Sequence, residues 1–455
     1  MIGFFDAING FIWGPWLLVP LLLGVGILLT VMLKGIQFKQ LGPALHLAFI
    51  KRKEETDEGD ISHYRALTTA LSGTVGTGNV VGVATAISLG GPGALFWMWI
   101  TALFGMATKY AEAVLGVKYR DTDRAGEKAG GPMFYLTNGL GGQTGRVLGT
   151  GFAIFAAIAA FGIGNTVQSN ATASYVDSAF GIPVWITGLV LTVGAGLVIL
   201  GGIRTIGRFT GIFVPFMMIF YVIGGLIIIL VNITSVPAAI ATIISTAFTG
   251  TAATGGFAGV GVAAAIQFGV ARGIFSNESG LGTGGIAAAS AQTTNPVRQG
   301  LVSMTQTFID TIVICSITGL AIVTTGVWTA GLEDDQLTQA AFSQGLGGLG
   351  PTIVTIGLAL FSFSTLITWA YYGERNMVYL FGRGGVLPYR LIFIAVIFFG
   401  AILSLDVVWG FATAMNGLMA LPNLIGLLLL SGVVVRETRA HFSGRRREGE
   451  EARVR

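Results

Sequence analysis

Charged side chains are scarce in this 455-residue chain. Only 11% of the residues are Asp, Glu, Lys or Arg, against about 25% in a soluble domain, and 53% are hydrophobic. The mean hydropathy is +0.76. Most of the chain is therefore expected to face lipid or other apolar helices, which excludes an ordinary water-soluble protein. The formal net charge of +4 gives no basic footprint, so no nucleic-acid partner is expected.

Cysteine and histidine are nearly absent. The single cysteine, Cys315, lies in an apolar run, so it can form no internal disulfide and is expected to pack as a small apolar residue. The three histidines are scattered and have no cysteine partners, so no zinc site is expected. No H-E-x-x-H or G-x-S-x-G sequence lies in an apolar run, which argues against a membrane-embedded enzyme. No enzymatic cofactor is expected.

Long apolar runs are what the chain does have. A membrane-spanning helix needs about 20 mostly apolar residues. This rule predicts an all-α integral membrane protein with about eleven transmembrane helices. The expected spans are Asn9–Leu33, Ile61–Leu89, Pro92–Val117, Leu148–Val176, Pro183–Gly201, Gly211–Val231, Ala258–Ser290, Gly300–Val327, Leu349–Leu380, Tyr389–Leu403 and Val407–Val434.

The distribution of basic residues sets an orientation. Lys and Arg gather on alternate loops, and such loops are enriched on the cytoplasmic side. We therefore expect a multi-pass protein of the cell membrane with its N-terminus outside and its C-terminus in the cytoplasm. The expected segments are an extra N-terminal helix (1–34), a cytoplasmic connector (35–60), a first five-helix repeat (61–232), an extracellular connector (233–257), a second five-helix repeat (258–434) and a charged cytoplasmic tail (435–455).

Two of the spans are interrupted by polar, glycine-rich runs. The sequence GTVGTGN occupies 73–79 and SNESGLGTG occupies 276–284. Without the first helix, these runs fall in the first and sixth of ten spans, which cross the membrane in opposite directions. Broken helices at corresponding positions of two inverted halves indicate the binding site of a transporter. The alternative is a glycine-lined packing face, which is the commoner role of one such run alone.

A broken helix offers backbone groups to a ligand. The N–H groups near Gly78–Asn79 and near Gly280–Gly282 suit a carboxylate, and the C=O groups near Gly73–Val75 and near Arg272–Phe275 suit a cation. A zwitterion of amino-acid size matches both sets. Further donors and acceptors are expected from the side chains of Thr74, Thr77, Asn79, Ser276 and Asn277, with Gly76 in the same turn.

Several polar residues lie inside expected spans, where they are costly and often functional. Arg272 and Glu278 flank the second run and are candidates either for a gate or for a structural pair. Lys109 with Glu112, and Glu374 with Arg375, are expected to form structural pairs or to extend toward the membrane surface. Asp310, Asn165 and Gln168 lie deep in their spans, and the two amides suit either substrate contacts or helix–helix hydrogen bonds.

The run GGPGALFWMWI at Gly90–Ile100, together with GTGN at Gly76–Asn79 and with SNESGLGTG, resembles the alanine or glycine:cation symporter family. The resemblance covers about residues 10 to 435 and implies the LeuT fold, which has two inverted five-helix repeats, each beginning with an unwound helix. It also implies uptake of alanine or glycine driven by sodium or protons, by alternating access. The extra N-terminal helix lies outside that ten-helix core.

The resemblance implies roles for individual residues. The N–H groups of Thr77, Gly78 and Asn79 would hold the substrate carboxylate, the carbonyls of Gly273–Phe275 would face its amine, and Ile274, Phe275 and Trp369 would enclose a small apolar pocket. A sodium ion would be bound by the carbonyls of Ser72 or Gly73, of Val75 and of Phe361, and by the hydroxyls of Ser364 and Thr365. A single sodium ion is expected because the first run carries no carboxylate, and proton coupling stays open.

The leading hypothesis is therefore a sodium-coupled symporter of alanine or glycine that works in the lipid bilayer, as a monomer. The alternatives are a related carrier for another small solute such as a nucleobase, and, more remotely, a passive channel, since broken helices also build selectivity filters.

Overall fold

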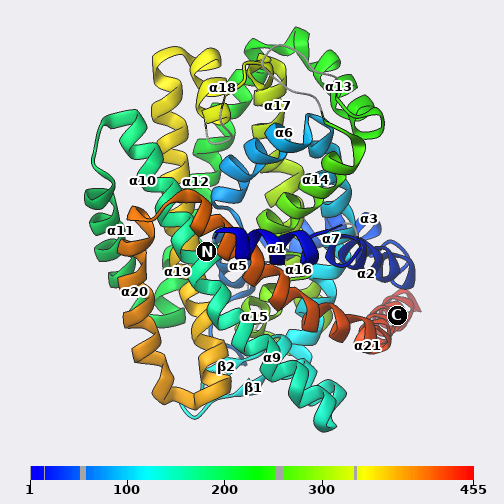
Figure 1. Cartoon of the computed structure of the whole chain (residues 1–455). Helices are drawn as coiled ribbons and strands as arrows, with labels where there is room; N and C mark the ends of the chain where they lie inside the picture. The colour runs from blue at the N-terminus through cyan, green and yellow to red at the C-terminus, as the bar shows by residue number, and fades with distance from the viewer. Residues whose placement is uncertain (1, 15, 52–57, 252–259, 333–335, 455) are drawn as a thin grey trace.

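The computed structural model of the chain is almost entirely helical (Figure 1). It describes residues 2–14, 16–51, 58–251, 260–332 and 336–454. Residues 52–57 of the first expected connector and 252–257 of the second lie outside the described residues.

The helices of the first half are α1 (Ile2–Ile12), α2 (Leu18–Met32), α3 (Ile36–Lys39), α4 (Leu41–Phe49), α5 (His63–Thr74), α6 (Val83–Gly90), α7 (Gly93–Lys118), α8 (Pro132–Phe134), α9 (Gly142–Phe161), α10 (Val167–Phe180), α11 (Val184–Ile199) and α12 (Gly202–Val231). Those of the second half are α13 (Val236–Thr249), α14 (Val262–Asn277), α15 (Thr283–Ala289), α16 (Pro296–Thr307), α17 (Ser316–Thr325), α18 (Gln336–Leu346), α19 (Gly350–Phe381), α20 (Val386–Ile402) and α21 (Leu405–Val454).

Shorter elements join these helices. Strands β1 (Asp121–Thr122) and β2 (Lys128–Ala129) pair in an antiparallel hairpin. The π-helical turns are η1 (Gly78–Gly82), η2 (Tyr135–Leu140), η3 (Gly162–Thr166) and η5 (Phe308–Cys315), and the 3-10 turns are η4 (Ile233–Ser235), η6 (Val327–Thr329), η7 (Gly347–Leu349) and η8 (Gly382–Gly385).

Within the described ranges, five helical segments are long and apolar enough to cross a membrane, or six when α5 and η1–α6 count as one bent span. They are Gly142–Phe180, Gly202–Val231, Pro296–Thr325, Gln336–Ile402 and Val407–Gly444. The expected all-α membrane protein is thus confirmed in its class. The number of eleven spans and the two five-helix repeats stay predictions.

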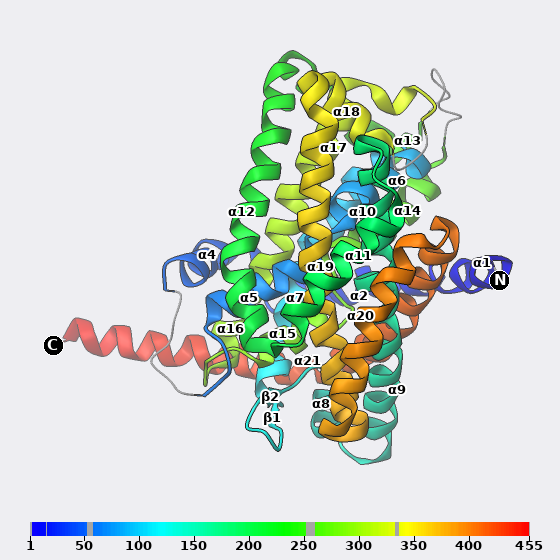
Figure 2. The same cartoon turned by 90° about the vertical axis from the view of Figure 1, so that its left-hand side faces the viewer.

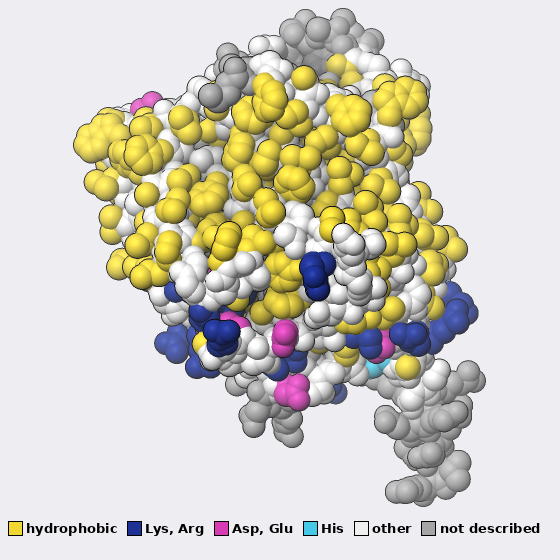
Figure 3. Space-filling view, turned by 60° about the horizontal axis from the view of Figure 1, so that its bottom comes forward, with side chains coloured by type: hydrophobic (Ala, Val, Ile, Leu, Met, Phe, Trp, Pro, Cys, Tyr) yellow, Lys and Arg dark blue, Asp and Glu magenta, His cyan; other side chains and the backbone are white. Residues whose placement is uncertain are grey.

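The outer surface of α11 and α12 is apolar. Leu197, Ile212 and Phe216 expose 75%, 77% and 61% of their surface. Exposed side chains of this size would cause aggregation in water, so they suit contact with lipid. Figure 3 shows a broad apolar surface with Lys and Arg gathered along its lower border, at the end of the bundle that carries the β1–β2 hairpin. We call this end of the bundle the hairpin end.

The prediction of one continuous helix over Asn9–Leu33 is wrong. Helix α1 ends at Ile12 and α2 begins at Leu18. The sequence between them contains Gly14 and Pro15, and glycine weakens a helix while proline lacks the N–H that a helix needs. In Figure 2, α1 lies across the direction of α12 and α19.

Helix α1 is fixed to α21 by side-chain hydrogen bonds. The Asn9 amide donates to the carbonyl of Gly410 at 3.1 Å, and the Trp13 indole donates to that of Thr413 at 2.9 Å. Helix α21 then continues without interruption through the expected start of the charged tail at residue 435. Its C-terminal end projects away from the bundle (Figure 2).

Candidate functional site

The first polar run breaks its helix as expected. Helix α5 ends at Thr74, Val75 is extended (φ −75°, ψ 95°), and the following η1–α6 segment is turned by 54°. The turn is closed locally, because the N–H of Gly76 donates to Oδ1 of Asn79 at 2.9 Å. The backbone therefore opens in the middle of a buried segment.

The second run also breaks its helix, slightly later than expected. Helix α14 continues to Asn277 and α15 begins at Thr283. Between them Glu278, Gly280 and Gly282 adopt positive φ angles of 58°, 97° and 89°. Two of these positions are glycines, which adopt such a backbone without steric cost, and only Glu278 carries a side chain there.

The backbone N–H groups of the second break are already bonded to a carboxylate of the protein. Oε1 of Glu112, on α7, accepts from the N–H of Gly280 and of Gly282 at 2.9 Å each, and from the Asn423 amide at 2.9 Å. Lys109, also fully buried, lies 3.9 Å from Glu112 and donates to the carbonyl of Glu278 at 3.0 Å. The pair is thus structural, which is one of the two expected alternatives, and it does not extend toward the membrane surface.

The residues expected to bind sodium lie together. Oγ1 of Thr365, on α19, is 3.0 Å from the carbonyl oxygen of Ser72, 3.3 Å from that of Val75 and 3.1 Å from that of Phe361. Oγ of Ser364 lies 2.8 Å from the same Phe361 carbonyl and 3.4 Å from that of Ser72. These five oxygens, here called the oxygen cluster, join α19 to the first break. Such a set of neutral oxygens suits a hard cation.

The carbonyl of Gly73 is directed elsewhere. It accepts from the indole N–H of Trp369 at 3.2 Å, and the same N–H lies 2.8 Å from Oε1 of Glu278. Trp369 therefore connects the two breaks. It is also closely packed, because a Cβ added at Gly164 would lie 2.1 Å from the tryptophan. Of the two carbonyls suggested for the cation, only that of Ser72 faces the oxygen cluster.

The groups expected to hold a carboxylate lie beside the oxygen cluster. The N–H of Thr77 donates to Oε1 of Gln168 at 3.1 Å, which brings this amide to the first break. An added Cβ on Gly76 would lie 2.6 Å from Oγ1 of Thr365 and 2.9 Å from Oε1 of Gln168. The Thr77 hydroxyl is fully buried and has no hydrogen-bond partner among the described residues. A buried hydroxyl of this kind is free to bond a water molecule or a ligand.

The two breaks touch one another. An added Cβ on Gly78 would lie 2.9 Å from the Cα of Ser276 and 3.3 Å from the ring of Phe275. Asp310, which is fully buried in η5, contacts both breaks. Its Oδ1 accepts from the Asn79 amide at 2.8 Å, and its Oδ2 accepts from the Ser276 hydroxyl at 2.8 Å.

Four other expected site residues make contacts within the protein. The Thr74 hydroxyl donates to carbonyls of its own helix. The Ile274 carbonyl accepts from the N–H of Glu278 at 2.8 Å, and Gly273 packs against α7. The Asn277 side chain donates to Thr311 at 3.2 Å and accepts from the N–H of Ser279 at 2.9 Å. Asn277 therefore shapes the break from within.

A cavity of about 150 Å³ lies on the other side of Phe275, between α1, α14 and α21. The Phe275 ring packs on Trp409 at 4.8 Å between centroids, and the guanidinium of Arg272 lies 4.4 Å from the Trp409 ring. Arg272 thus contacts α21, while the Glu278 carboxylate accepts from the Trp369 indole and from the Thr283 hydroxyl. The cavity is also lined by Asn416, whose buried amide has no partner among the described residues. It is lined by both apolar and polar side chains and lies next to Phe275, near the end of α14.

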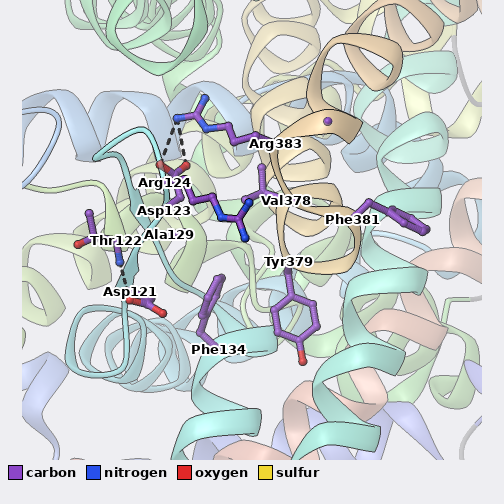
Figure 4. A pocket seen from close by; sticks show the side chains of 12 residues that line it. Asp121, Thr122, Asp123, Arg124, Ala129, Phe134, Val378, Tyr379, Phe381 and Arg383 are labelled. Carbon is purple, nitrogen blue, oxygen red and sulfur yellow. Dashed lines mark hydrogen bonds and ion pairs between the residues drawn. The ribbon is translucent and has the colours of Figure 1, made fainter.

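A larger cavity of about 580 Å³ lies at the hairpin end, remote from the breaks (Figure 4). Beside it, Arg375 lies 3.2 Å from Asp123, 3.2 Å from Glu127 and 2.5 Å from Glu374, and Arg383 lies 3.1 Å from Asp123. Burial alone would raise the pKa of Asp123, but the Ala125 N–H and the Arg383 guanidinium hold it below its usual range. This network, with the expected Glu374–Arg375 pair in it, fastens the hairpin to α19.

Comparison with known proteins identifies the family. The model of the sodium:alanine symporter family matches residues 1–455. The chain is 54% identical to the sodium/alanine symporter AgcS of Methanococcus maripaludis, over 98% of both chains. The chain belongs to the sodium:alanine symporter family.

Other relatives are more distant. This chain is 37% identical to the putative sodium/proton-dependent alanine carrier protein YrbD of Bacillus subtilis, over 95% of this chain and 90% of that protein. It is also 37% identical to the probable sodium/glutamine symporter GlnT of Bacillus subtilis, over 94% and 87% of the two chains. Sodium-coupled symport of amino acids across a membrane follows from this membership, and it is a transport rather than an enzymatic activity.

The fold agrees with the family. The structure of MhsT in complex with L-phenylalanine matches 84% of this chain and 99% of that chain with a TM-score of 0.58, at 11% sequence identity. At this identity the match concerns the fold alone, and it supports the LeuT fold implied by the sequence resemblance.

The sequence does not predict that Asp310 and Glu112 support the breaks. Both are charged residues of expected spans, and Glu112 is expected only to pair with Lys109 or to extend, yet each one connects a break to a neighbouring helix. A carboxylate deep in an apolar run was the available signal, but its partners are far away in the sequence and could not be paired with it.

Proposed function

We propose that this symporter couples inward sodium movement to the uptake of alanine or glycine by alternating access. The observation that carries the proposal is the oxygen cluster, in which Ser72 and Val75 offer carbonyls from one side of the first break. Thr77, one turn on, offers its N–H and its unpartnered hydroxyl from the other side. One short segment therefore serves both the ion and the amino acid.

Sodium would bind within the oxygen cluster. The hydroxyls of Ser364 and Thr365 now donate to carbonyl oxygens, and each can rotate to present a lone pair to a cation. The carbonyls of Ser72, Val75 and Phe361 would complete the site. Binding there joins α19 to the end of α5, which fixes the direction of the N–H groups that follow.

The substrate carboxylate would bind at Thr77, Gly78 and Asn79. Oε1 of Gln168 now accepts from the N–H of Thr77, and a bound carboxylate would take its place. The hydroxyl of Ser276 and the C-terminal end of α14 lie next to Gly78, where the two breaks touch. The five oxygens of the oxygen cluster are all neutral, so the charge of the substrate carboxylate beside them would favour the ion, and this links the two binding events.

Selectivity for small side chains would come from bulk around the glycines. Gly76 and Gly78 are packed so closely that neither position has room for a Cβ. The buried rings of Phe275 and Trp369 would limit the size of the substrate side chain. A methyl side chain fits this description, whereas a branched chain would contact the aromatic rings. The glutamine named for one relative makes the length of the accepted side chain a question for experiment.

The remaining parts of the proposal concern orientation and assembly. The basic border of the apolar surface (Figure 3) supports the hairpin end as the cytoplasmic side, with the C-terminus inside and the N-terminus outside. The Arg272–Trp409 contact would then lie on the outer approach and the Arg375 network on the inner one. Both breaks come from one chain, so a monomer contains the complete site.

Uptake of labelled alanine into proteoliposomes tests the proposal. With an inward sodium gradient we expect accumulation above equilibrium, which glycine and serine reduce and leucine does not. Accumulation without sodium would reject sodium coupling, and accumulation driven by a pH gradient alone would establish proton coupling instead. Current through the protein in the absence of any substrate would indicate a channel.

A further inference from the structure

A groove of about 450 Å³ lies between the α2–α3 junction and the C-terminal half of α21. Its polar side is formed by Lys34, Lys39 and Arg439, and its apolar side includes Leu33, Ile36 and Phe442. This groove lies apart from the two helix breaks. We propose that it binds the phosphate headgroup of an anionic phospholipid, with an acyl chain on the adjoining apolar surface.

The three cations are available to a ligand. Lys34, Lys39 and Arg439 are all exposed, and within the described part of the chain no acidic side chain lies at ion-pair distance from them. The acid nearest to Arg439 in sequence, Glu437, is bound by Lys118 on α7 at 2.7 Å. Three unneutralised cations around one groove therefore form a site for an anion, and phosphate oxygens are suitable partners for them.

The backbone holds the first of these cations in an unusual position. Lys34 has a φ of 56° and Gly35 a φ of 67°, so two consecutive residues are left-handed. They end α2 through hydrogen bonds from Gly35 N–H to the carbonyl of Thr30 at 2.8 Å and from Lys34 N–H to that of Val31 at 3.0 Å. A lysine is seldom found in this conformation, and residues held in it are concentrated at functional sites.

The surroundings favour a lipid over a soluble phosphate. Val31 and Phe38 flank the groove in sequence and expose 69% and 61% of their surface. Lys34, Lys39 and Arg439 are exposed beside the apolar side chains that line the same groove. A phospholipid presents its phosphate beside its acyl chains, so it matches both sides of the groove.

The occupant would connect two parts of the chain that are distant in sequence. Lys34 and Lys39 follow α2, whereas Arg439 lies some way past the apolar part of α21. A phosphate bound by all three would hold the projecting end of α21 against the N-terminal segment. The groove is therefore a site through which the lipid composition of the membrane can stabilise the protein.

The test compares two lipids on the full chain in detergent. Native mass spectrometry is used to titrate phosphatidylglycerol and phosphatidylcholine with identical acyl chains. We expect one phosphatidylglycerol to bind at least tenfold more tightly than phosphatidylcholine. The variant K34Q/K39Q/R439Q should lose this preference.

The matched control is R146Q/R204Q/R208Q, which removes three exposed cations near the N-terminal ends of α9 and α12 and changes the net charge equally. It should keep the preference for phosphatidylglycerol. An equal loss in both variants would show a general effect of charge and would overturn the site, as would an unchanged preference in K34Q/K39Q/R439Q. The melting temperature without added lipid should be the same in all three proteins, because the substituted side chains are on the surface.

A second arm separates the two sources of phosphate. Glycerol phosphate at millimolar concentration should not displace the bound phosphatidylglycerol if the acyl chain contributes to binding. Displacement at that concentration would identify the groove as a site for a soluble phosphate, and the lipid proposal would be abandoned.

Discussion

Oγ1 of Thr365 lies 3.0 Å from the carbonyl oxygen of Ser72, across the gap between α19 and the first broken helix. The same hydroxyl approaches the carbonyls of Val75 and Phe361, so it stands at the centre of the oxygen cluster.

Thr365→Ala should weaken sodium dependence while the protein stays folded. Removing one oxygen ligand of a cation costs about 1.5–3 kcal/mol, which corresponds to a decrease of roughly 10- to 100-fold in apparent sodium affinity. The measurement is alanine uptake as a function of sodium concentration. Thr365→Ser, which keeps the hydroxyl, serves as the control and should stay near wild type. An unchanged sodium affinity in Thr365→Ala would remove this residue from the ion site.

Gly78→Ala should abolish substrate binding. The added Cβ would lie 2.9 Å from the Cα of Ser276, and backbone at that distance cannot move without separating the two breaks. Gly82→Ala in the same turn is the control, since its Cβ would meet only the Thr77 carbonyl at 3.8 Å, an ordinary contact. We expect a loss of at least tenfold in alanine affinity for Gly78→Ala and wild-type affinity for Gly82→Ala. Equal behaviour of the two variants would show that the approach at Gly78 is not needed.

The sequence predicts where the helices break but not what supports the breaks. The runs around Gly78 and Gly280 are so rich in glycine and polar residues that an interrupted helix follows from local propensity. The partners of those breaks, Asp310 and Glu112, are contributed by η5 and α7. Which side chain faces which helix depends on rotation about the helix axis, and η5 is a π-helical turn that changes this rotation.

At both ends of the chain, the expected helix boundaries differ from those in the structure. The run Asn9–Leu33 is long enough to span a membrane, and the rule based on apolar length favours one helix. Gly14 and Pro15 lie within it, and the structure ends α1 at Ile12. At the other end, α21 runs through the charged tail because Glu, Arg and Ala are good helix formers and charge alone does not stop a helix.

Glu112 should be essential for the stability of the second break. Glu112→Leu would leave the N–H groups of Gly280 and Gly282 without an acceptor and Lys109 without its neighbouring anion, all inside the protein. Breaking a buried pair from one side costs about 3–5 kcal/mol. The measurement is thermal unfolding of the purified protein in detergent, where the variant should melt at a clearly lower temperature.

The double variant Lys109→Met/Glu112→Leu is the control for this effect. It removes both charges, so it should be more stable than Glu112→Leu alone, although the two glycine N–H groups remain unpaired. The single variant Lys109→Met completes the comparison. If the stability losses of Lys109→Met and Glu112→Leu add up to that of the double variant, the charge of Glu112 does not act on Lys109, and the lower stability of Glu112→Leu would come from the lost backbone contacts only.

The hairpin end should lose stability in acid through Asp123. The pKa of this carboxyl is lowered, because hydrogen bonds and the Arg383 charge outweigh its burial. A carboxyl with a lowered pKa stabilises the fold above its unfolded value of about 3.9, and the contribution is lost as the pH falls through the folded pKa. Asp123→Asn should therefore lower stability by about 1–3 kcal/mol at pH 7, a range reduced by the partial exposure of Arg383.

The difference in melting temperature between wild type and Asp123→Asn should stay constant from pH 7 to about pH 5 and shrink below about pH 4. The pKa of Asp60, which accepts from the N–H of Lys128 at 3.0 Å, is shifted in the opposite direction from that of Asp123, because burial raises it. Its contribution decreases as the pH rises through that pKa, but it is present in both proteins and cancels in the comparison. Asp121→Asn, in the same hairpin and exposed, should change stability little at any pH. A difference for Asp123→Asn that does not vary with pH would mean that the ionised carboxyl contributes nothing to fastening the hairpin to α19.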